Sequence, residues 1–598
     1  MYIVLGAAEN PPPANSAVSA PWWEAVTLTE TGFGSHKTVP EYRLGELIQQ
    51  VETAHPRANV RWVWADSRLI MPLLLAQGVS PERAHDLRLV QRILAVAATR
   101  PQSSIAYEST LDLLMTSADQ PAGMFPPARQ IQGQDSLFDD DLLGSNPRRK
   151  DEEKQAPTSS QLAAELTAQL RAIDTSPAPR RLRLLAAEST GGMIAAEMKF
   201  FGMPRNKALH EKLLTETLGP RPAQFERPSA MEKLAGEIRE KLSAPRLNVD
   251  SPQELLKAMQ TAGIRVSSTS KWALKGWAGE NSQLAEQRQN LIEPLLAYKK
   301  LARLYTANGW NWLDEWVHNN RFYPSYEVGG VVTGRWGANG GGAMQIPRDV
   351  RTAVAAEDGM MLVVADASQV EPRILAAMSG DQHLALAGRG TDLYLGIAEI
   401  GDRTGSALND RAKAKIALLG AMYGATTGES GKLMPHLRQL FPQAIEFTEQ
   451  AARIGERGGQ VVTYLGRVSP SPTPEWFSRQ AQQATEQDER AARTASRSWE
   501  RFTRNFVVQG TAAEWALCWM AQIRQQLRSR KLFGQPLQSR LVYFLHDEIM
   551  IYGPQREGQI CEQIIREAAQ SAGELIFGQV PVEFPVTVAI TDNYSKAK

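Results

Sequence analysis

Three carboxylates lie in two short stretches where buried strands are expected to end. Residues 361–365 form an apolar run with the composition of a buried strand, and Asp366 follows it directly. Beyond it, apolar residues return at helical spacing and stop at Gly380. A rigid strand end that faces the start of a helix can hold a divalent cation beside a phosphate, because the helix amides donate to the anion. An ordinary strand–turn–helix with an aspartate at the turn is the alternative.

The other two carboxylates, Asp547 and Glu548, follow His546 within residues 542–551. Apolar residues flank them on both sides, so the segment predicts either a hairpin whose turn presents the acids or a strand with an acidic bulge. Together with Asp366, these side chains would supply the oxygen ligands that Mg²⁺ prefers.

Residues 411–424 (RAKAKIALLGAMYG) place four side chains on one face of a predicted helix. Arg411, Lys415, Leu419 and Tyr423 are each four residues apart, which brings them into one stripe at helical rise. The stripe combines two cations, an apolar residue and an aromatic ring. It would suit a triphosphate bound to the cations and a base or sugar packed against the ring.

These stretches resemble motifs A, B and C of family A DNA polymerases, the DNA polymerase I type. Residues 366–373 read DASQVEPR, beside the family's D-Y-S-Q-I-E-L-R. Motif B, R-x3-K-x3-F-x3-Y-G, is matched except at the phenylalanine, where this chain has Leu419. Residues 546–548 read HDE, which is motif C. Further matches in the same order are T-G-R at 333–335, Q-I-P at 345–347 and NFVVQGTAA at 505–513.

The resemblance runs from about Leu184 to the C-terminus and implies a multidomain fold of α/β and α+β type. An exonuclease-like (RNase H-like) α/β domain would precede a right-hand polymerase with palm, fingers and thumb. The predicted boundaries are 1–118 for the exonuclease-like domain, 119–160 for a linker, 161–330 for the thumb and the entry to the palm, 331–400 for the palm with motif A, 401–500 for the fingers with motif B, and 501–598 for the palm with motif C.

The resemblance also implies catalytic roles. Asp366 and Asp547 would hold two Mg²⁺ ions, with Mn²⁺ as the alternative, and Glu548 would support them without binding the metal directly. Lys415 and Arg411 would neutralise the β- and γ-phosphates, and Lys415 would protonate the pyrophosphate leaving group. The expected ligands are primer–template DNA and deoxynucleoside triphosphates.

Other residues complete the expected nucleotide and DNA sites. Glu371 occupies the position of the family's steric gate against a 2′-hydroxyl, and Tyr423 would stack at the templating site or close the pocket. Arg335, with Gln509 as its partner, would test the primer terminus in the minor groove, where contacts carry little sequence information. The remaining candidates are Leu419, Gln369 and Tyr394 for the nucleotide, and His546, Asn505, Arg501, Gln345, Lys299, Lys300 and Arg303 for DNA.

Two of these assignments have a plain alternative. Lys299, Lys300 and Arg303 would bind duplex phosphates, but they would equally form a solvated basic face on a long helix. The same alternative applies to Arg501, which precedes Asn505 in an arginine-rich segment.

Several positions depart from the family pattern. Leu419 replaces the aromatic residue that packs on the nucleotide, Ala367 replaces the tyrosine after the motif A aspartate, and Tyr394 stands where the family usually has histidine. Near the primer terminus, Met344 and Gln345 replace glutamine and asparagine. We expect catalysis with altered nucleotide affinity or fidelity, because all the carboxylates and phosphate-binding cations remain.

The first 118 residues alternate strand-like and helical patterns, which predicts an α/β domain. Asp66 and Asp86 match the family's second acidic exonuclease motif, but the D-x-E pair of the opening strand is missing. A proofreading site needs about four carboxylates to hold two metals. We expect an inactive scaffold in which both aspartates are helix caps or surface residues. Strands are expected at 2–5, 25–28 and 60–64, and helices at 69–75, 87–96 and 111–115.

Residues 119–160 are rich in proline, glycine, aspartate, serine and lysine, and predict a flexible linker. Within it, Gln134, Leu137 and Phe138 belong to the pentapeptide QDSLF, which resembles the bacterial sliding-clamp-binding peptide Q-x-S/D-L-F. The apolar pair would fill a pocket and the glutamine would form hydrogen bonds. The alternative is a linker with two incidental apolar residues.

Composition places the chain among soluble globular proteins of several domains, with 43% hydrophobic and 22% charged residues. At a net charge of +1, a nucleic-acid enzyme must gather its basic residues in a groove. Only two cysteines, Cys518 and Cys561, indicate a reducing compartment, and we find no signal peptide and no apolar run of about 18 residues. We expect a cytoplasmic, nucleoid-associated monomer without membrane contact.

The predicted function is template-directed DNA synthesis from a primer 3′-hydroxyl, without proofreading or a 5′ nuclease, in repair, lesion bypass or replication. A non-catalytic DNA-binding or clamp-recruited scaffold with the same fold is the alternative. The grouping of Asp366, Asp547, Arg411 and Lys415 argues against a scaffold, because such charges are costly to hold without a metal or phosphate. The missing D-x-E pair argues against a nuclease.

Overall fold

A computed structural model describes most of the chain. It covers residues 1–9, 11, 21–29, 32–55, 60–101, 105–114, 156–174, 179–279, 284–338, 346–425, 428–481 and 485–597. The predicted clamp peptide with Gln134, Leu137 and Phe138 lies outside these residues, as do Met344 and Gln345. None of the helices in these ranges is both long and apolar enough to cross a membrane.

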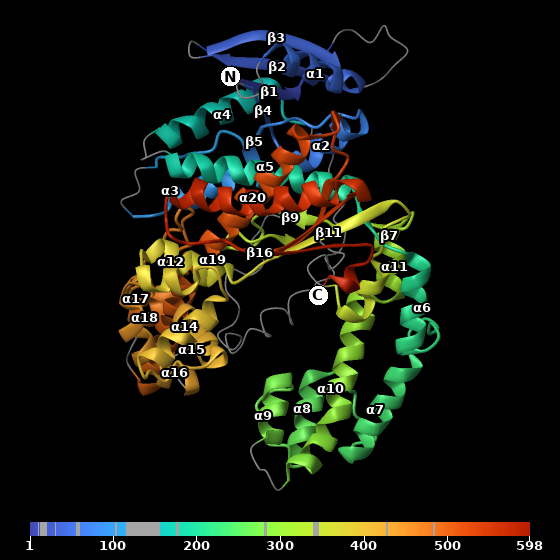
Figure 1. The fold of residues 1–598 in the computed structure, drawn as a ribbon, viewed down its shortest axis with the longest axis vertical. Coiled ribbons are helices and arrows are strands. Elements are labelled where there is room, and N and C mark those ends of the chain that lie inside the picture. The colour runs from blue at the N-terminus through green and yellow to red at the C-terminus, as the bar shows by residue number, and fades with distance from the viewer. Residues whose placement is uncertain are drawn as a thin grey trace.

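The N-terminal part is a mixed five-stranded sheet with helices on it, as the α/β prediction required (Figure 1). The strand order is β3-β2-β1-β4-β5; β1 to β3 pair antiparallel, and β4 and β5 continue the sheet in parallel. Three predicted strands and two predicted helices are present; β3, the three-residue β5 and helix α1 were not predicted. The elements are β1 (Tyr2–Ala7), β2 (Trp22–Thr29), β3 (Gly32–Pro40), β4 (Arg61–Trp64), β5 (Ala84–Asp86), α1 (Leu44–Ala54), α2 (Ser67–Ala76) and α3 (Leu87–Ala98).

Alternating side chains of the sheet fill two separate cores. On β4, Trp62 and Trp64 belong to the core that α1 and α2 build on one face, because successive strand residues point to opposite faces. Val63 points the other way and packs with Leu162 and Leu166 of α4 (Ser159–Asp174). Helix α4 therefore completes the N-terminal domain, although the sequence placed residues 161–330 with the thumb.

Residues 111–114 do not form the predicted helix. The Leu113 amide donates to the Gln91 side chain, whose own amide donates to the Leu111 carbonyl. Leu111 and Leu113 pack against the second core of the sheet. Apolar residues two apart fit an extended segment, and this run is too short for periodicity to separate that pattern from a helical one.

Helix α5 (Pro179–Phe201) joins the N-terminal domain to the palm. Its two glycines allow helix α3 of the N-terminal domain and helix α19 to approach closely. A Cβ at Gly192 would lie 2.9 Å from Leu89 Cδ1 of α3, and a Cβ at Gly191 would lie 2.7 Å from Leu517 Cδ2 of α19. Substitution at either position would push one domain away from α5.

The palm contains an antiparallel sheet of order β14-β15-β11-β16. Strand β11 lies in its interior between β15 and β16, and residues 361–365 are all buried, which explains their continuous apolar run. Helix α20 packs against β11 and β16 (Figure 1). The elements are β11 (Met360–Ala367), β14 (Arg540–Leu545), β15 (Glu548–Pro554), β16 (Val586–Thr591) and α20 (Gly558–Phe577).

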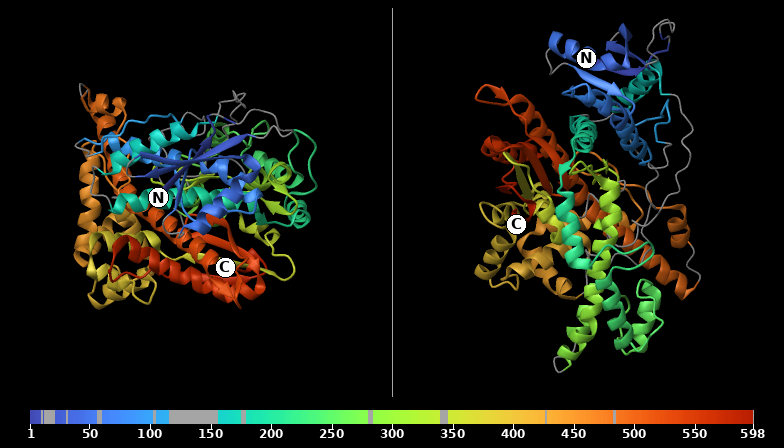
Figure 2. Two further views of the ribbon diagram at one scale, coloured as in Figure 1. Left: turned by 90° about the horizontal axis from the view of Figure 1, so that it is seen from above. Right: turned by 90° about the vertical axis from the view of Figure 1, so that its right-hand side faces the viewer.

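The thumb and fingers are helical and extend from the palm on either side (Figure 1). The thumb lies at the opposite end of the molecule from the N-terminal sheet, as the right-hand panel of Figure 2 shows. Thumb helices are α6 (Lys207–Leu218), α7 (Ser229–Lys241), α8 (Pro252–Thr261), α9 (Lys271–Gly279) and α10 (Ala285–Asn308); α11 (Trp310–Trp316) leads back to the palm.

The fingers contain helices from both sides of the palm boundary that was predicted at residue 500. Helix α19 (Glu486–Ser529) is one continuous helix of 44 residues that crosses this boundary and packs on both α17 and α20. The other helices are α12 (Val370–Ser379), α13 (Gln382–Ala387), α14 (Leu393–Arg403), α15 (Arg411–Tyr423), α16 (Gly428–Leu440), α17 (Pro442–Glu456) and α18 (Pro474–Ala481). Helices α12 to α14 lie almost entirely within residues 331–400, which were predicted as palm, but α12 packs on α17 and α14 packs on α15.

Candidate functional site

The segment with His546, Asp547 and Glu548 is a hairpin, one of the two predicted forms. Leu545 at the end of β14 pairs with Glu548 at the start of β15, so His546 and Asp547 form the turn between them. His546 has a φ of 56°, in the left-handed region that non-glycine residues seldom adopt. The turn therefore holds a strained residue next to a carboxylate, an arrangement found at functional sites.

The sheet brings Asp366 and Asp547 together from segments about 180 positions apart. Asp366 lies opposite Glu548 in the register of β11 and β15, and the Ala367 amide donates to the Asp547 carbonyl at 2.8 Å. Asp366 is half-buried and Asp547 is exposed, so both carboxylates stand at the same end of the palm sheet within reach of solvent.

Glu548 lies in a different environment from the two aspartates. It is buried, and the Tyr594 hydroxyl donates to its carboxylate. Burial together with the Glu548 charge raises the pKa of Tyr594 above its ordinary value, so the tyrosine stays a donor. The guanidinium of Arg351 lies 4.3 Å from the centre of the Tyr594 ring. The C-terminal segment thus fixes Glu548 behind the aspartates, where it can support them.

The donor set at this end of the sheet fits Mg²⁺. Asp366 and Asp547 offer hard oxygen ligands, and Mg²⁺ is commonly held by one or two carboxylates together with substrate phosphates. Within the described ranges, no three His, Cys, Asp or Glu side chains come together as a complete metal site. The remaining ligands would have to come from outside the protein, as they do where the metal and a triphosphate bind together.

Glu371, on α12 five residues after Asp366, contacts two other predicted site residues. Its carboxylate accepts a hydrogen bond from Tyr423 Oη at 2.5 Å and forms an ion pair with Arg335. Burial and the Glu371 charge raise the pKa of Tyr423, and the same two causes raise that of Tyr394. The structure therefore gathers residues predicted to contact the nucleotide and the primer around one carboxylate.

Asp392 is a site residue that the sequence reasoning missed. It caps α14 through the Leu395 amide, accepts hydrogen bonds from Gln369 Nε2 at 2.5 Å and Arg411 Nη2 at 2.8 Å, and lies two residues before Tyr394. The pKa of Asp392 is lowered: burial opposes the shift, and hydrogen bonding from Arg411 outweighs it. An aspartate directly before a predicted helix was a signal for the cap, but its two long-range partners had no local signal.

The stripe predicted on residues 411–424 exists as α15. Lys415 is exposed, and among the described residues its ammonium has no hydrogen-bond or ion-pair partner. Arg411 is also exposed, and its guanidinium lies 5.7 Å from the centre of the Tyr394 ring. Leu419 is partly buried and packs against the main core of the molecule. Lys415, without a partner among the described residues, and Arg411, which Asp392 orients, thus stand on the same helix face.

Arg335 and Gln509 lie on neighbouring segments, as the resemblance implied. Gly510 of α19 approaches the T-G-R turn so closely that a Cβ there would lie 3.1 Å from the Thr333 carbonyl oxygen. Burial and the charge of Arg335 lower the pKa of His546 to about 4, which keeps its imidazole neutral at pH 7. Arg335 therefore lies near both Glu371 of motif A and His546 of motif C.

The other predicted DNA contacts are spread over two places. On α10, Lys299 donates to Thr269, Lys300 pairs with Asp349 at 3.0 Å, and Arg303 is exposed. On α19, Asn505 is half-buried, and Arg501 donates to Ser498 and packs on Gly424 at the end of α15. Their roles toward DNA stay predictions.

Asp66 and Asp86 are helix caps, as predicted, but they are buried rather than on the surface. Asp66 caps α2 through the Arg68 amide, and Asp86 caps α3 through the Leu89 amide. Burial would raise the pKa of Asp66, but the charges of Arg88 and Arg68 hold it below its ordinary value. Burial and the charge of Asp66 raise the pKa of Asp86 to about 6. Both carboxylates therefore already have partners within the protein.

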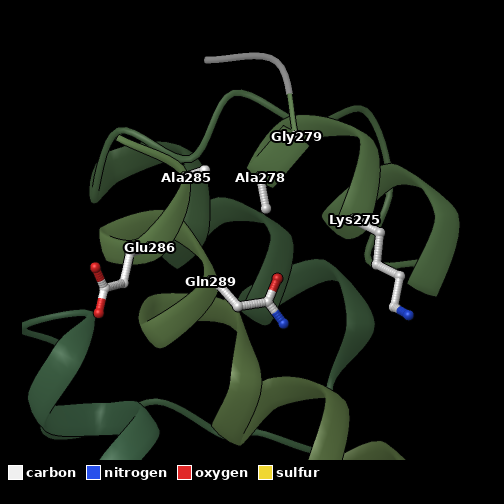
Figure 3. Close-up of a pocket in the computed structure, with 6 residues that line it drawn as sticks. All are labelled: Lys275, Ala278, Gly279, Ala285, Glu286 and Gln289. Carbon is white, nitrogen blue, oxygen red and sulfur yellow. The ribbon is translucent and has the colours of Figure 1, made fainter. Parts of the chain in front are cut away.

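A pocket at the tip of the thumb lies away from these residues (Figure 3). It has a volume of about 450 Å³ between α9 and the start of α10. Its lining includes none of the predicted site residues, and the thumb places it far from β11 (Figure 1). The pocket residues are Lys275, Ala278, Gly279, Ala285, Glu286 and Gln289.

Comparison with known sequences decides the family. The sequence model of DNA polymerase family A matches residues 223–596, which is more than half of the chain. The chain belongs to DNA polymerase family A. The match includes Asp366, the α15 stripe and the Asp547 hairpin, so the family assignment and the geometry coincide.

Family A relatives with curated names are distant. DNA polymerase I of Chloroflexus aurantiacus is 27% identical over 377 residues, which cover 58% of this chain and 37% of that protein. The thermostable DNA polymerase I of Thermus filiformis is 26% identical over 392 residues, covering 61% of this chain and 44% of that protein. The matched region thus spans less than half of the length of these relatives.

A solved structure shares the fold. It is the POL domain of Pol1 from M. smegmatis in complex with DNA primer-template and dNTP. It superposes with a TM-score of 0.64 at 19% identity and covers 97% of this chain and 93% of that one. This likeness includes the N-terminal domain and supports the predicted α/β domain followed by a right-hand polymerase.

Proposed function

We propose that the protein is a DNA-directed DNA polymerase that extends a primer 3′-hydroxyl at the end of the palm sheet. The observation that carries the proposal is the hydrogen bond between the Ala367 amide and the Asp547 carbonyl, which holds the two aspartate-bearing segments side by side. The relatives named DNA polymerase I and the fold shared with a polymerase domain support it.

We assign the metal site to Asp366 and Asp547. Mg²⁺ bound there would acidify the primer 3′-hydroxyl and neutralise charge on the α-phosphate. The protein itself contributes two carboxylates on a rigid strand and hairpin, and Glu548, anchored by Tyr594, keeps that end of the sheet in place.

We assign the triphosphate to the exposed face of α15. Arg411 would bind phosphate oxygens with a guanidinium that Asp392 already orients. Lys415 would bind beside it and hold on Nζ the proton that the pyrophosphate leaving group takes up. Glu371 would exclude a 2′-hydroxyl, since Tyr423 and Arg335 fix its carboxylate in the pocket.

We further propose that the enzyme lacks proofreading and acts in repair, lesion bypass or replication. Asp66 and Asp86 are buried helix caps, and a metal would have to displace their hydrogen bonds, which supports the lack of proofreading. The QDSLF peptide supports recruitment by a sliding clamp. Cys518 and Cys561 are both free and buried, which agrees with a cytoplasmic setting.

Extension of a labelled primer tests the proposal. With Mg²⁺ and dNTPs, wild-type protein should lengthen the primer, and Asp366→Asn and Asp547→Asn should not. Asp358→Asn is the matched control, because Asp358 is exposed just before the opposite end of β11. DNA binding without extension by the wild type would favour the scaffold. Shortening of the primer without dNTPs would contradict the proposed lack of proofreading.

A further inference from the structure

A chain of buried opposite charges leads from the N-terminal domain toward the primer-testing segment of the palm. Asp66 pairs with Arg88 at 3.0 Å, and Arg88 pairs with Glu327 at 3.1 Å. Arg92 continues the chain, at 3.4 Å from Glu327 and 3.6 Å from Glu188. The members alternate in sign, so each buried charge has an opposite neighbour.

Most of this network is enclosed in the protein, although the Arg92 side chain is 20% exposed. The side chains of Arg88 and Glu327 are 4% and 6% exposed, and that of Glu188 is fully buried. Glu188 also pairs with Arg467 at 2.9 Å. Solvent screens such buried pairs weakly, so a change at one end is felt by the next charge along.

The far end of the network holds the segment that carries Arg335. Glu327 is the last residue of β9 (Tyr326–Glu327), and Arg92 also donates to the carbonyl of Val328. Arg467 packs beneath Gly334, where a Cβ would lie 2.5 Å from its Nε. Arginines therefore fix both ends of residues 328–334.

Within this segment the backbone closes on itself. The Val331 amide donates to the Arg335 carbonyl at 3.1 Å, and the Gly334 amide donates to the Val331 carbonyl at 2.8 Å. Arg335 then reaches Glu371. A shift of Glu327 would thus move the turn that aims the Arg335 guanidinium at the primer terminus.

A second buried arginine, Arg524, also links the palm to the N-terminal domain. Arg524 of α19 pairs with Glu197 at 2.8 Å and donates to the carbonyls of Pro81 and Glu82 in the N-terminal domain. This contact includes no residue of the segment 327–335 and is a natural comparison for the first.

We propose that Arg88 and Glu327 are positioning residues through which the N-terminal domain sets Arg335 at the primer terminus. The inference rests on the proposed polymerase function. Asp66, at the position of an exonuclease acid, thus anchors a charge network that positions Arg335 for primer recognition. The N-terminal domain thus affects the accuracy of synthesis by positioning Arg335 in the palm, and not by excising mismatched nucleotides.

The test compares Arg88→Gln with Arg524→Gln, since each replaces a buried arginine that joins the domains. The readout is the ratio of extension efficiency, kcat/KM, on matched and mismatched primer termini. We expect Arg88→Gln and Glu327→Gln to lower this ratio by about three- to thirtyfold, the range of couplings carried by packed networks. Arg524→Gln should leave the ratio unchanged while lowering thermal stability to a similar extent.

Hydrogen exchange supplies a readout that does not depend on activity. The amides of residues 328–335 should exchange faster in Arg88→Gln and Glu327→Gln than in the wild type, and no faster in Arg524→Gln. An unchanged ratio in a folded Arg88→Gln, or equal changes in Arg524→Gln, would overturn the proposal. If the wild type extends no primer, the proposed function fails, and unaltered exchange in residues 328–335 would then refute the coupling separately.

Discussion

Glu371 and Tyr423 should act as one unit in nucleotide selection. The Tyr423 hydroxyl donates to the Glu371 carboxylate at 2.5 Å, and Arg335 pairs with the same carboxylate. Tyr423→Phe removes one donor and keeps the ring, whereas Glu371→Gln keeps the shape and removes the charge. Tyr423→Phe thus releases only the ring, whereas Glu371→Gln also weakens the pairing with Arg335.

The expected loss in kcat/KM depends on how far solvent reaches the Glu371 carboxylate and its partner Arg335. A hydrogen bond to a charged group contributes about 1.5–3 kcal/mol. The Glu371 side chain is 16% exposed and that of Arg335 is 26% exposed, so solvent competes and about 1–2 kcal/mol is the appropriate range. This corresponds to a loss of about 5- to 30-fold in kcat/KM for a correct dNTP.

Single-nucleotide incorporation by the two single variants and the double variant measures the coupling. We expect the double variant to be no worse than the more impaired single variant, because both changes break the same contact. Glu371→Ala should in addition admit ribonucleotides, whereas Glu371→Gln, which fills the same space, should not. Losses that multiply in the double variant would refute the shared role of this carboxylate.

Three further predictions concern affinity, pH and packing. Lys415→Ala should raise the KM for dNTP about tenfold or more without changing Tm, while Lys413→Ala on the same helix should not; incorporation kinetics and thermal melting check this. Burial raises the pKa of Glu514 to about 7, above the 4.5 of an exposed glutamate. Between about pH 5 and 8 the unfolded state therefore binds fewer protons than the folded state, and the free energy of unfolding falls as the pH rises. The Tm of Glu514→Gln relative to the wild type should therefore rise over this range; a constant difference would contradict it. Gly510→Ala places a Cβ 2.5 Å from a side-chain carbon of the neighbouring loop and should cost about 1–3 kcal/mol in denaturant unfolding, whereas Gly236→Ala, with nothing within 4 Å, should not destabilise.

The core of the site was predictable because its signals are local. An apolar run ending at Asp366, a charged turn between two apolar arms, and a four-residue stripe on α15 each require only short-range patterns. The hairpin register then places Asp547 beside Ala367, which sequence alone could not show.

Long-range ionic contacts were not predictable. Arg68 and Glu327 are 259 positions apart, yet they form an ion pair, and Arg68 also pairs with Asp66. Asp66 is thus a helix cap as predicted, but one whose charge partners the sequence did not indicate. Asp392 likewise connects Gln369 and Arg411 across separate elements. No periodicity encodes such pairs, because they arise only when elements that are distant in the sequence pack together.

Template-dependent incorporation tests most directly whether Asp366 and Asp547 form a template-directed polymerase site. Four templates that differ only in the first unpaired base would each be offered one dNTP at a time with Mg²⁺, using wild type, Asp547→Asn and Asp358→Asn. We expect wild type and Asp358→Asn to add the complementary nucleotide on each template, and Asp547→Asn to add none. Addition that ignores the template, or that persists in Asp547→Asn, would contradict a template-directed polymerase site at Asp366 and Asp547.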